Sequence, residues 1–181
     1  MTDQTTSANQ PNEQTPSTSG FSAQWLIGVG IGAFAAGLIA AGFLMVTLMP
    51  SMMIVTHESQ YGFDETVERI QAGIPEIGWS SPGMLNINQS LQKHDVALEP
   101  QVKIIQMCQP NYAKQVLESN RDLSCMMPCA VAVWEGDDGT VYISKMNTGL
   151  MGKMFGGTVA EVMGNKVSAD ENQLLNPLFK G

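Results

Sequence analysis

The sequence has few charged residues, and most of those are acidic. Only 14% of the 181 residues are Asp, Glu, Lys or Arg, against about 25% in an ordinary soluble domain. No Lys or Arg occurs before Arg69, and 9 basic residues stand against 17 acidic ones, a net charge of −8. This balance excludes nucleic-acid binding, which needs clustered Lys and Arg against phosphates. It also excludes a polybasic patch for anionic lipids.

The sequence motifs of common enzyme classes are missing as well. Neither Gly156-Gly157 nor the Gly149–Gly152 segment is followed by the Lys-Ser/Thr pair of a phosphate-binding loop. Neither Gly-x-Ser-x-Gly nor His-Glu-x-x-His occurs. With only 2 histidines, a catalytic triad has few candidate members. The sequence favours a protein that is not an enzyme.

The first 49 residues divide into a polar tail and an apolar run. Residues 1–24 are rich in Thr, Ser, Gln, Asn and Pro, and we expect them to be disordered because they have little apolar surface to bury. Residues 25–49 carry no charge. As a helix they would span about 37 Å, enough for a hydrocarbon core of ~30 Å. With Trp25 at the interface and Pro50 ending the helix, they predict a single transmembrane anchor rather than a cleaved signal peptide.

Small residues recur at every fourth position of this predicted anchor, at Gly28, Gly32, Ala36 and Ala40. Such spacing lets two helix backbones approach closely. It therefore favours a homodimer or docking on a membrane-protein partner. Because neither flank carries Lys or Arg, the orientation rests on the usual topology of a single N-terminal anchor, which leaves the bulky domain outside the cytoplasm.

Residues 50–181 predict one soluble domain with a net charge of −6, since they hold all 9 basic residues and all acidic ones except Asp3 and Glu13. Alternation and β-branched residues predict strands, and apolar residues at helical spacing predict helices. The expected strands are 52–59, 84–89 and 101–108 and a hairpin over 129–146; the expected helices are 63–74, 110–118 and two short ones on either side of Gly156-Gly157. The fold class is α+β, a small and mostly antiparallel sheet with helices packed on one face.

Four segments of this domain carry a family resemblance. They are Thr66-Val67-Glu68-Arg69, Cys108-Gln109-Pro110-Asn111-Tyr112-Ala113, the run from Met127-Pro128-Cys129 to Trp134-Glu135, and Ser144-Lys145-Met146-Asn147. Together they resemble the "domain of unknown function 302" family over about residues 52–175. The resemblance implies a small α+β fold, usually in single copy and sometimes membrane-anchored. It implies no activity, and Cys125 is a cysteine additional to the family pattern.

Sulfur is the distinctive chemistry of the domain. Cys108, Cys125 and Cys129 are open to three interpretations: thiols without a role, a disulfide of Cys129 with either of the others, or a metal or haem-like site. Met126 and Met127 between two thiols would suit a soft metal of the copper type, with His57 as a nitrogen ligand. We expect Cys108 and Cys129 to face each other across a sheet edge.

The sequence as a whole predicts a single-pass membrane protein whose domain is a binding or interaction module at the membrane surface. The alternative is a thiol-based redox domain, or one that binds a soft metal or haem through the cysteines. Apart from a possible soft metal, no cofactor follows from the sequence, and no substrate does.

Overall fold

The computed structural model describes residues 23–181. The chain separates into two compact units, Met1–Met45 and Val46–Gly181. The expectation of a disordered tail over residues 1–24 falls almost wholly outside the described residues. The first described element is α1 (Ala23–Met53), and its Gly32–Met49 window is long and apolar enough to cross a membrane. Length and composition alone do not separate an anchor from a signal sequence.

The prediction that Pro50 ends this helix is wrong, because α1 continues to Met53. A proline removes one backbone donor, and near the end of a helix this costs a single hydrogen bond. Ser51 adds a side-chain hydrogen bond within this part of the helix, since its Oγ donates to the Leu48 carbonyl at 2.7 Å. The first strand, β1 (Ile54–Glu58), consequently begins two residues later than the expected Met52.

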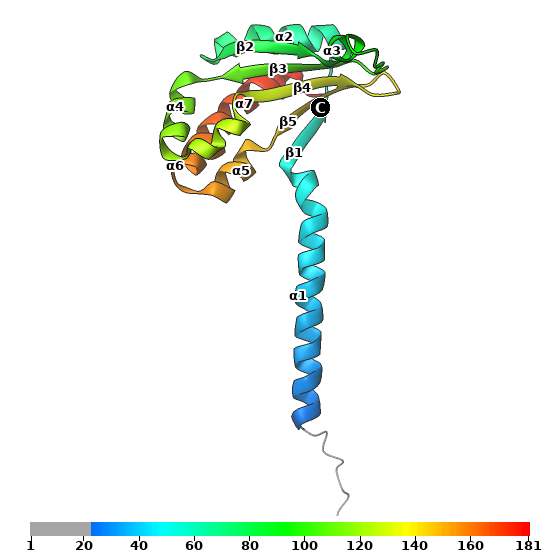
Figure 1. Ribbon diagram of the computed structural model, residues 1–181, viewed down its shortest axis with the longest axis vertical. Helices are drawn as coiled ribbons and strands as arrows, with labels where there is room; N and C mark the ends of the chain where they lie inside the picture. The colour runs from blue at the N-terminus through cyan, green and yellow to red at the C-terminus, as the bar shows by residue number, and fades with distance from the viewer. Residues whose placement is uncertain (1–22) are drawn as a thin grey trace, which may run out of the picture. The chain divides into compact units, whose positions relative to one another are not determined.

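Unit Val46–Gly181 is built on a five-stranded sheet in the order β1-β5-β4-β3-β2. Every neighbouring pair is antiparallel. Helices α4 (Pro110–Ser119), α5 (Thr148–Phe155) and α6 (Gly157–Val159) gather at one end of the sheet, opposite the tip of the β4–β5 hairpin (Figure 1). The other strands are β2 (Ser80–Asn86), β3 (Val102–Cys108), β4 (Cys129–Glu135) and β5 (Val141–Met146).

One face of the sheet is buried and the other is open. Along β3, β4 and β5 the buried residues alternate with half-buried or exposed ones, as two-residue periodicity requires. The buried face packs against α2 (Phe63–Glu76), whose apolar stripe includes Val67, Ile70 and Ile74. The prediction of an α+β fold with an antiparallel sheet is confirmed. We call the two sides the helical face and the open face.

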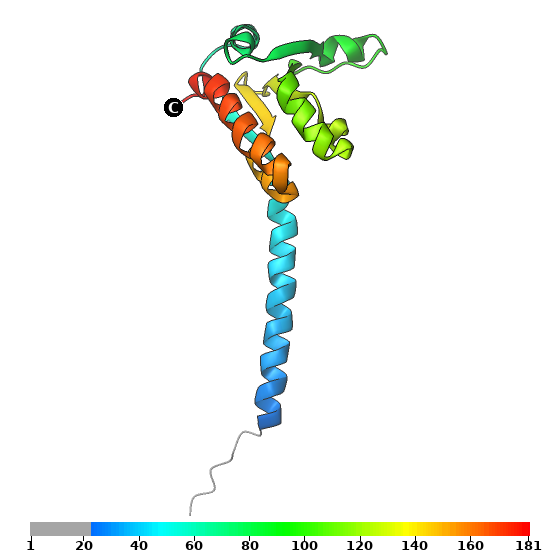
Figure 2. The same ribbon diagram turned by 90° about the vertical axis from the view of Figure 1, so that its left-hand side faces the viewer.

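Helices that precede and follow the β4–β5 hairpin in the chain complete the core. Before it lie α4 (Pro110–Ser119), with Pro110 in its first turn as expected, and the 3-10 helix η1 (Arg121–Met126). After it come α5 (Thr148–Phe155), α6 (Gly157–Val159), the π-helix η2 (Ala160–Val167), α7 (Ser168–Leu175) and the 3-10 helix η3 (Asn176–Leu178). The segments from α6 to α7 follow one another as one rod in the second view (Figure 2). The expected break falls at Gly156 and Gly157, both at positive φ.

The predicted strand over 84–89 is only partly right. β2 starts at Ser80 and ends at Asn86, and α3 (Ile87–Gln92) begins where the strand was expected to continue. The reason is a helix cap, because the Asn86 side chain accepts a hydrogen bond from the Gln89 amide at 3.0 Å. The apolar alternation of Leu85 and Ile87 therefore crosses an element boundary.

Candidate functional site

The sheet divides at one end because β4 and β5 part from each other. The two strands pair from Glu135↔Val141 to Val131↔Lys145. Beyond that point β5 continues with β1, as Met146 pairs with Ile54, whereas β4 continues with β3. A gap opens between two strands that are neighbours elsewhere. We call it the β4–β5 split.

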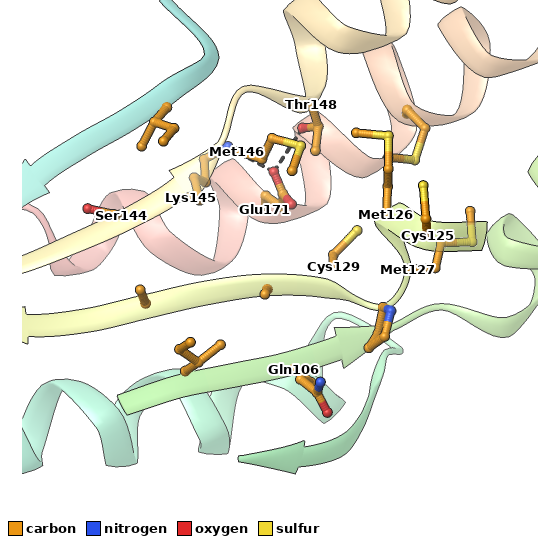
Figure 3. Close-up of a pocket in the computed structure, with 16 residues that line it drawn as sticks. Gln106, Cys125, Met126, Met127, Cys129, Ser144, Lys145, Met146, Thr148 and Glu171 are labelled. Carbon is orange, nitrogen blue, oxygen red and sulfur yellow. Dashed lines mark hydrogen bonds and ion pairs between the residues drawn. The ribbon is translucent and has the colours of Figure 1, made fainter. Parts of the chain in front are cut away.

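A cavity of about 530 Å³ occupies the split. It begins on the open face, where Ile104, Ala132 and Ser144 line it, and reaches Lys145 and Glu171 on the helical face. The labelled side chains of Figure 3 surround this space, with Cys125, Met126, Met127 and Cys129 together on one side and Met146 apart from them, near Glu171. Its complete lining is Ile54, Ile104, Gln106, Cys125, Met126, Met127, Pro128, Cys129, Ala130, Ala132, Ser144, Lys145, Met146, Thr148, Met163 and Glu171.

The deep end of the cavity holds a buried ion pair. Lys145 Nζ donates to Glu171 Oε2 at 2.8 Å, and Thr148 Oγ1 donates to the same oxygen at 2.9 Å. Lys145 is 9% exposed and Glu171 is 2% exposed. Within residues 23–181 the ammonium makes no other hydrogen bond and Glu171 Oε1 accepts none. Lys145 thus retains unused protons, and Glu171 an unused oxygen, for a molecule in the cavity.

The Cys129 thiol lies beside this pair and stays protonated at neutral pH. Burial raises its pKa from 9.0 to about 12, because the thiolate would lose water, and the nearby Glu171 carboxylate opposes a second negative charge. A protonated thiol is a poor nucleophile and a poor metal ligand. The deep end of the cavity therefore combines one cation, one anion and one neutral thiol.

The three cysteines are free thiols in this structure. Cys125 and Cys129 line the same cavity, and Cys125 is exposed, its Sγ donating to the Asp122 carbonyl at 3.2 Å. The expected pairing of Cys108 with Cys129 is off by one residue. Met107 is the partner of Cys129, and Cys108 lies opposite Ser80 on β2.

The other sulfur candidates also reach the cavity, but the histidine does not. Met126 and Met127 line it, together with Met146 and Met163. His57 lies on β1, where its ring stacks on Phe179 with centroids 4.0 Å apart, and it is not part of the cavity lining. Among residues 23–181, no three His, Cys, Asp or Glu side chains lie together as a metal site would require.

The small-residue positions of the predicted anchor lie in α1. Gly32, Ala36 and Ala40 are exposed, and a methyl group added at Gly32 would meet no atom within 4 Å. The surroundings of Gly28 are outside the described residues. Helix association therefore stays a prediction.

Sequence reasoning missed Lys145, Thr148 and Glu171 as site residues, although two of them carry a signal. Lys145 shares the two-residue alternation of Val141 and Ile143, which puts a charge on the helical face. Glu171 precedes Leu174 and Leu175 by three and four positions, so it shares their buried stripe. A charge at a buried position calls for a partner. Thr148 has no such signal.

The fold and site together define a small α+β domain whose antiparallel sheet opens at one end into a largely apolar cavity. The chain belongs to the DUF302 family, a domain of unknown function, whose family model matches residues 55–176. It is also similar to a solved structure, an uncharacterized conserved protein DUF302 from Bacillus stearothermophilus, with 20% sequence identity and a TM-score of 0.62. The match covers 70% of this chain and 98% of that one, and it supports the fold alone. No curated protein matches the sequence.

Proposed function

We propose that this protein is a membrane-anchored binding domain that takes up a small, neutral and largely apolar molecule. The observation that carries the proposal is the cavity in the β4–β5 split, whose apolar walls end on a polar floor without net charge. Its volume of about 530 Å³ is typical of small-molecule sites, which lie between about 300 and 1,000 Å³.

The walls favour an apolar body for the ligand. They are formed by aliphatic and thioether side chains from β1, β3, β5, η1 and η2, among them Ile54, Ile104, Met126, Met146 and Met163. Thioether side chains are flexible and polarizable, so they adapt to ligands of different shape. Such a lining is suited to several hydrophobic ligands of related shape rather than to a single rigid ligand.

The floor favours a neutral polar group at one end of that ligand. The charges of Lys145 and Glu171 cancel, and Cys129 is protonated. A charged group would leave a net charge beside these buried side chains, which is costly. A hydroxyl group can accept a hydrogen bond from Lys145 Nζ and donate one to Glu171 Oε1. We therefore expect an alcohol to bind better than a carboxylate of the same chain length.

Membrane attachment through α1 is part of the proposal. Its support is the Gly32–Met49 window of α1, none of which is buried, and the absence of charge from residues 25–49. The domain is expected outside the cytoplasm, as the topology of single N-terminal anchors suggests. Self-association through Gly32, Ala36 and Ala40 belongs to the same proposal, and crosslinking of the full chain in bilayers tests it.

The cavity is tested by photolabelling the full chain in lipid nanodiscs with a diazirine-bearing medium-chain alcohol. Mass spectrometry should locate the label on the cavity lining, especially Met126, Met127 and Met163. Ala132→Trp fills the cavity from the open face and should remove this label. The matched control is Ala97→Trp at an exposed loop position, which should leave it unchanged. Labelling that is scattered, or that survives Ala132→Trp, contradicts the proposal.

A soft metal is the second candidate, and one observation favours it. Six of the sixteen lining residues carry sulfur: Cys125, Met126, Met127, Cys129, Met146 and Met163. Thioethers bind Cu(I) without losing a proton, so the raised pKa of Cys129 does not exclude them. Titration of the chain with Cu(I) against a chelator decides between the candidates. Binding that falls in Met126→Leu with Met127→Leu, while alcohol labelling fails in the unmodified chain, favours the metal.

A further inference from the structure

Exposed apolar side chains gather beside the shallow end of the cavity. We call this set the rim: Met52, Met53, Ile54, Met146 and Met154, which are 54%, 36%, 60%, 40% and 56% exposed. Ile54 is the strand partner of Met146. Met53, Met146 and Met154 line one shallow groove. The rim is therefore one surface rather than scattered exposed residues, and contiguous apolar surfaces of this kind mark contact sites.

Hydrogen bonds join the two chain segments that form the rim, the last turn of α1 and the residues after β5. The Asn147 amide donates to the Met53 carbonyl at 2.8 Å, and Asn147 Nδ2 donates to the Met52 carbonyl at 3.0 Å. The Asn147 side chain also accepts from the Leu150 amide, so the same residue caps α5. One asparagine thus ties α5, the end of β5 and residues 52–53 into one piece.

Chain length limits how far the rim can lie from the end of the apolar window. That window closes at Met49, and Met52 follows three residues later in the same helix. At 1.5 Å per residue, three residues advance about 5 Å. If α1 spans a bilayer, the rim lies at the depth of the headgroups, where apolar side chains of peripheral surfaces insert by about 5–10 Å.

The charge of this region agrees with such a location. Residues 46–56 and 146–155 contain no acidic residue, and Lys153 is their one charged residue, exposed on α5. The domain around it is acidic, with a net charge of −6 over residues 50–181. A region free of carboxylates avoids repulsion from anionic headgroups, and Lys153 adds attraction.

We infer that the rim contacts the lipid bilayer and holds the shallow end of the cavity at the membrane surface. The inference rests on the proposed anchor and deepens the proposed function, because Ile54 and Met146 belong to both the rim and the cavity lining. A ligand of low water solubility then passes between bilayer and cavity along an apolar surface.

Tryptophan quenching tests the contact in the full chain, reconstituted into vesicles of phosphatidylcholine with added phosphatidylglycerol. Met154→Trp places a fluorophore in the rim, and Val96→Trp places one at a site of similar exposure, 49%, in the loop after α3. Phosphatidylcholine brominated near the headgroup quenches by contact. The emission of the added tryptophan is obtained by subtracting the emission of the unmodified chain. It is then compared between vesicles with and without brominated lipid.

We expect the Met154→Trp emission to be quenched at least about twofold more strongly than that of Val96→Trp, because a rim side chain would insert among the acyl chains. Lys153→Glu should reduce this quenching when phosphatidylglycerol is present and change it little without it. Equal quenching at both positions overturns the inference, as does quenching at neither. If alcohol labelling of the cavity persists in that case, the proposed function stands and only the membrane contact fails. If labelling fails while Met154→Trp is quenched, the contact stands without the ligand site.

Discussion

The two ends of the β4–β5 pair differ in how their side chains are used. At the hairpin end, Trp134 stacks on Tyr142 with ring centroids 4.5 Å apart, and its Nε1 donates to Ser144 Oγ at 2.8 Å. At the split end, Met146 pairs with β1 but has no partner on β4, and Lys145 faces a cavity. The same two strands form a closed pair at one end and a site at the other. Strand pairing, rather than a catalytic motif, creates the site.

The aromatic stack at the closed end stabilises the hairpin. The split end instead holds a buried ion pair, which is costly in a core. An aromatic stack adds about 0.5–1.5 kcal/mol beyond the area it buries. A buried ion pair contributes little net stability, since the loss of hydration offsets the attraction. The presence of Lys145 and Glu171 where apolar residues would serve is consistent with a role in binding.

The largest expected effect comes from removing one partner of the buried pair. Lys145→Met should lower the free energy of unfolding by about 3–5 kcal/mol, because Glu171 is left as an unpaired buried charge. Urea denaturation of the full chain, followed by tryptophan fluorescence, measures it. The double variant Lys145→Met with Glu171→Gln should recover most of the loss.

The control for this prediction is Lys114→Met, which breaks the exposed pair with Glu118 and should change stability by less than about 1 kcal/mol. If Lys145→Met costs no more than Lys114→Met, the pair at the split end is not buried as the structure has it. A buried ion pair would then no longer distinguish the split end from the hairpin end.

A smaller effect is expected at the closed end. Trp134→Ala removes the stack on Tyr142 and the hydrogen bond to Ser144, so it should lower the free energy of unfolding by about 1–3 kcal/mol. Because Trp134 does not line the cavity, labelling by the diazirine alcohol should persist. Denaturation and labelling of the same preparation check both parts. A loss of labelling as large as that of Ala132→Trp would show that the hairpin end also maintains the cavity.

The sequence contains the elements of this fold more clearly than the site. Periodicity predicts α2 and β3, and the Asp-Gly step predicts the hairpin, because these patterns are local. Asn86 shows where local reasoning fails, since a cap on Gln89 interrupts what reads as strand alternation. Pro50 fails differently, because one lost hydrogen bond near a helix end is tolerated.

The split depends on which strand lies beside which, and no local pattern contains that information. The sequence places Lys145 on the helical face, but it does not indicate that β4 pairs with β5 only from Val131 onward. Nor does spacing show that Glu171, 26 residues later, reaches the same point. The sulfur residues Cys125, Met126, Met127 and Cys129 were identified because they are close in sequence. Their ionic neighbours could be found only through the fold.

The smallest effect expected on stability concerns Cys129. The pKa of this thiol at the split end differs from that of a solvent-exposed thiol. With a pKa of about 12 against 9.0 for a free thiol, the reactive thiolate is scarce at pH 8. Iodoacetamide should therefore modify Cys129 at least about 100-fold more slowly in the folded chain than in the urea-unfolded chain. Peptide mass spectrometry measures both rates, with the exposed Cys125 as an internal reference.

The same raised pKa gives a dependence of stability on pH with a definite sign. Below pH 9 the thiol is protonated in both states and adds no slope. Between about 9 and 12 the unfolded chain releases the proton and the folded chain retains it, so the contribution of Cys129 to stability falls as the pH rises. Cys129→Ala should remove this component, so its stability should decline less steeply above pH 9 than that of the unmodified chain. Equal slopes, together with fast modification of Cys129 at pH 8, would mean that the thiol is solvated and that the deep end of the split is open to water.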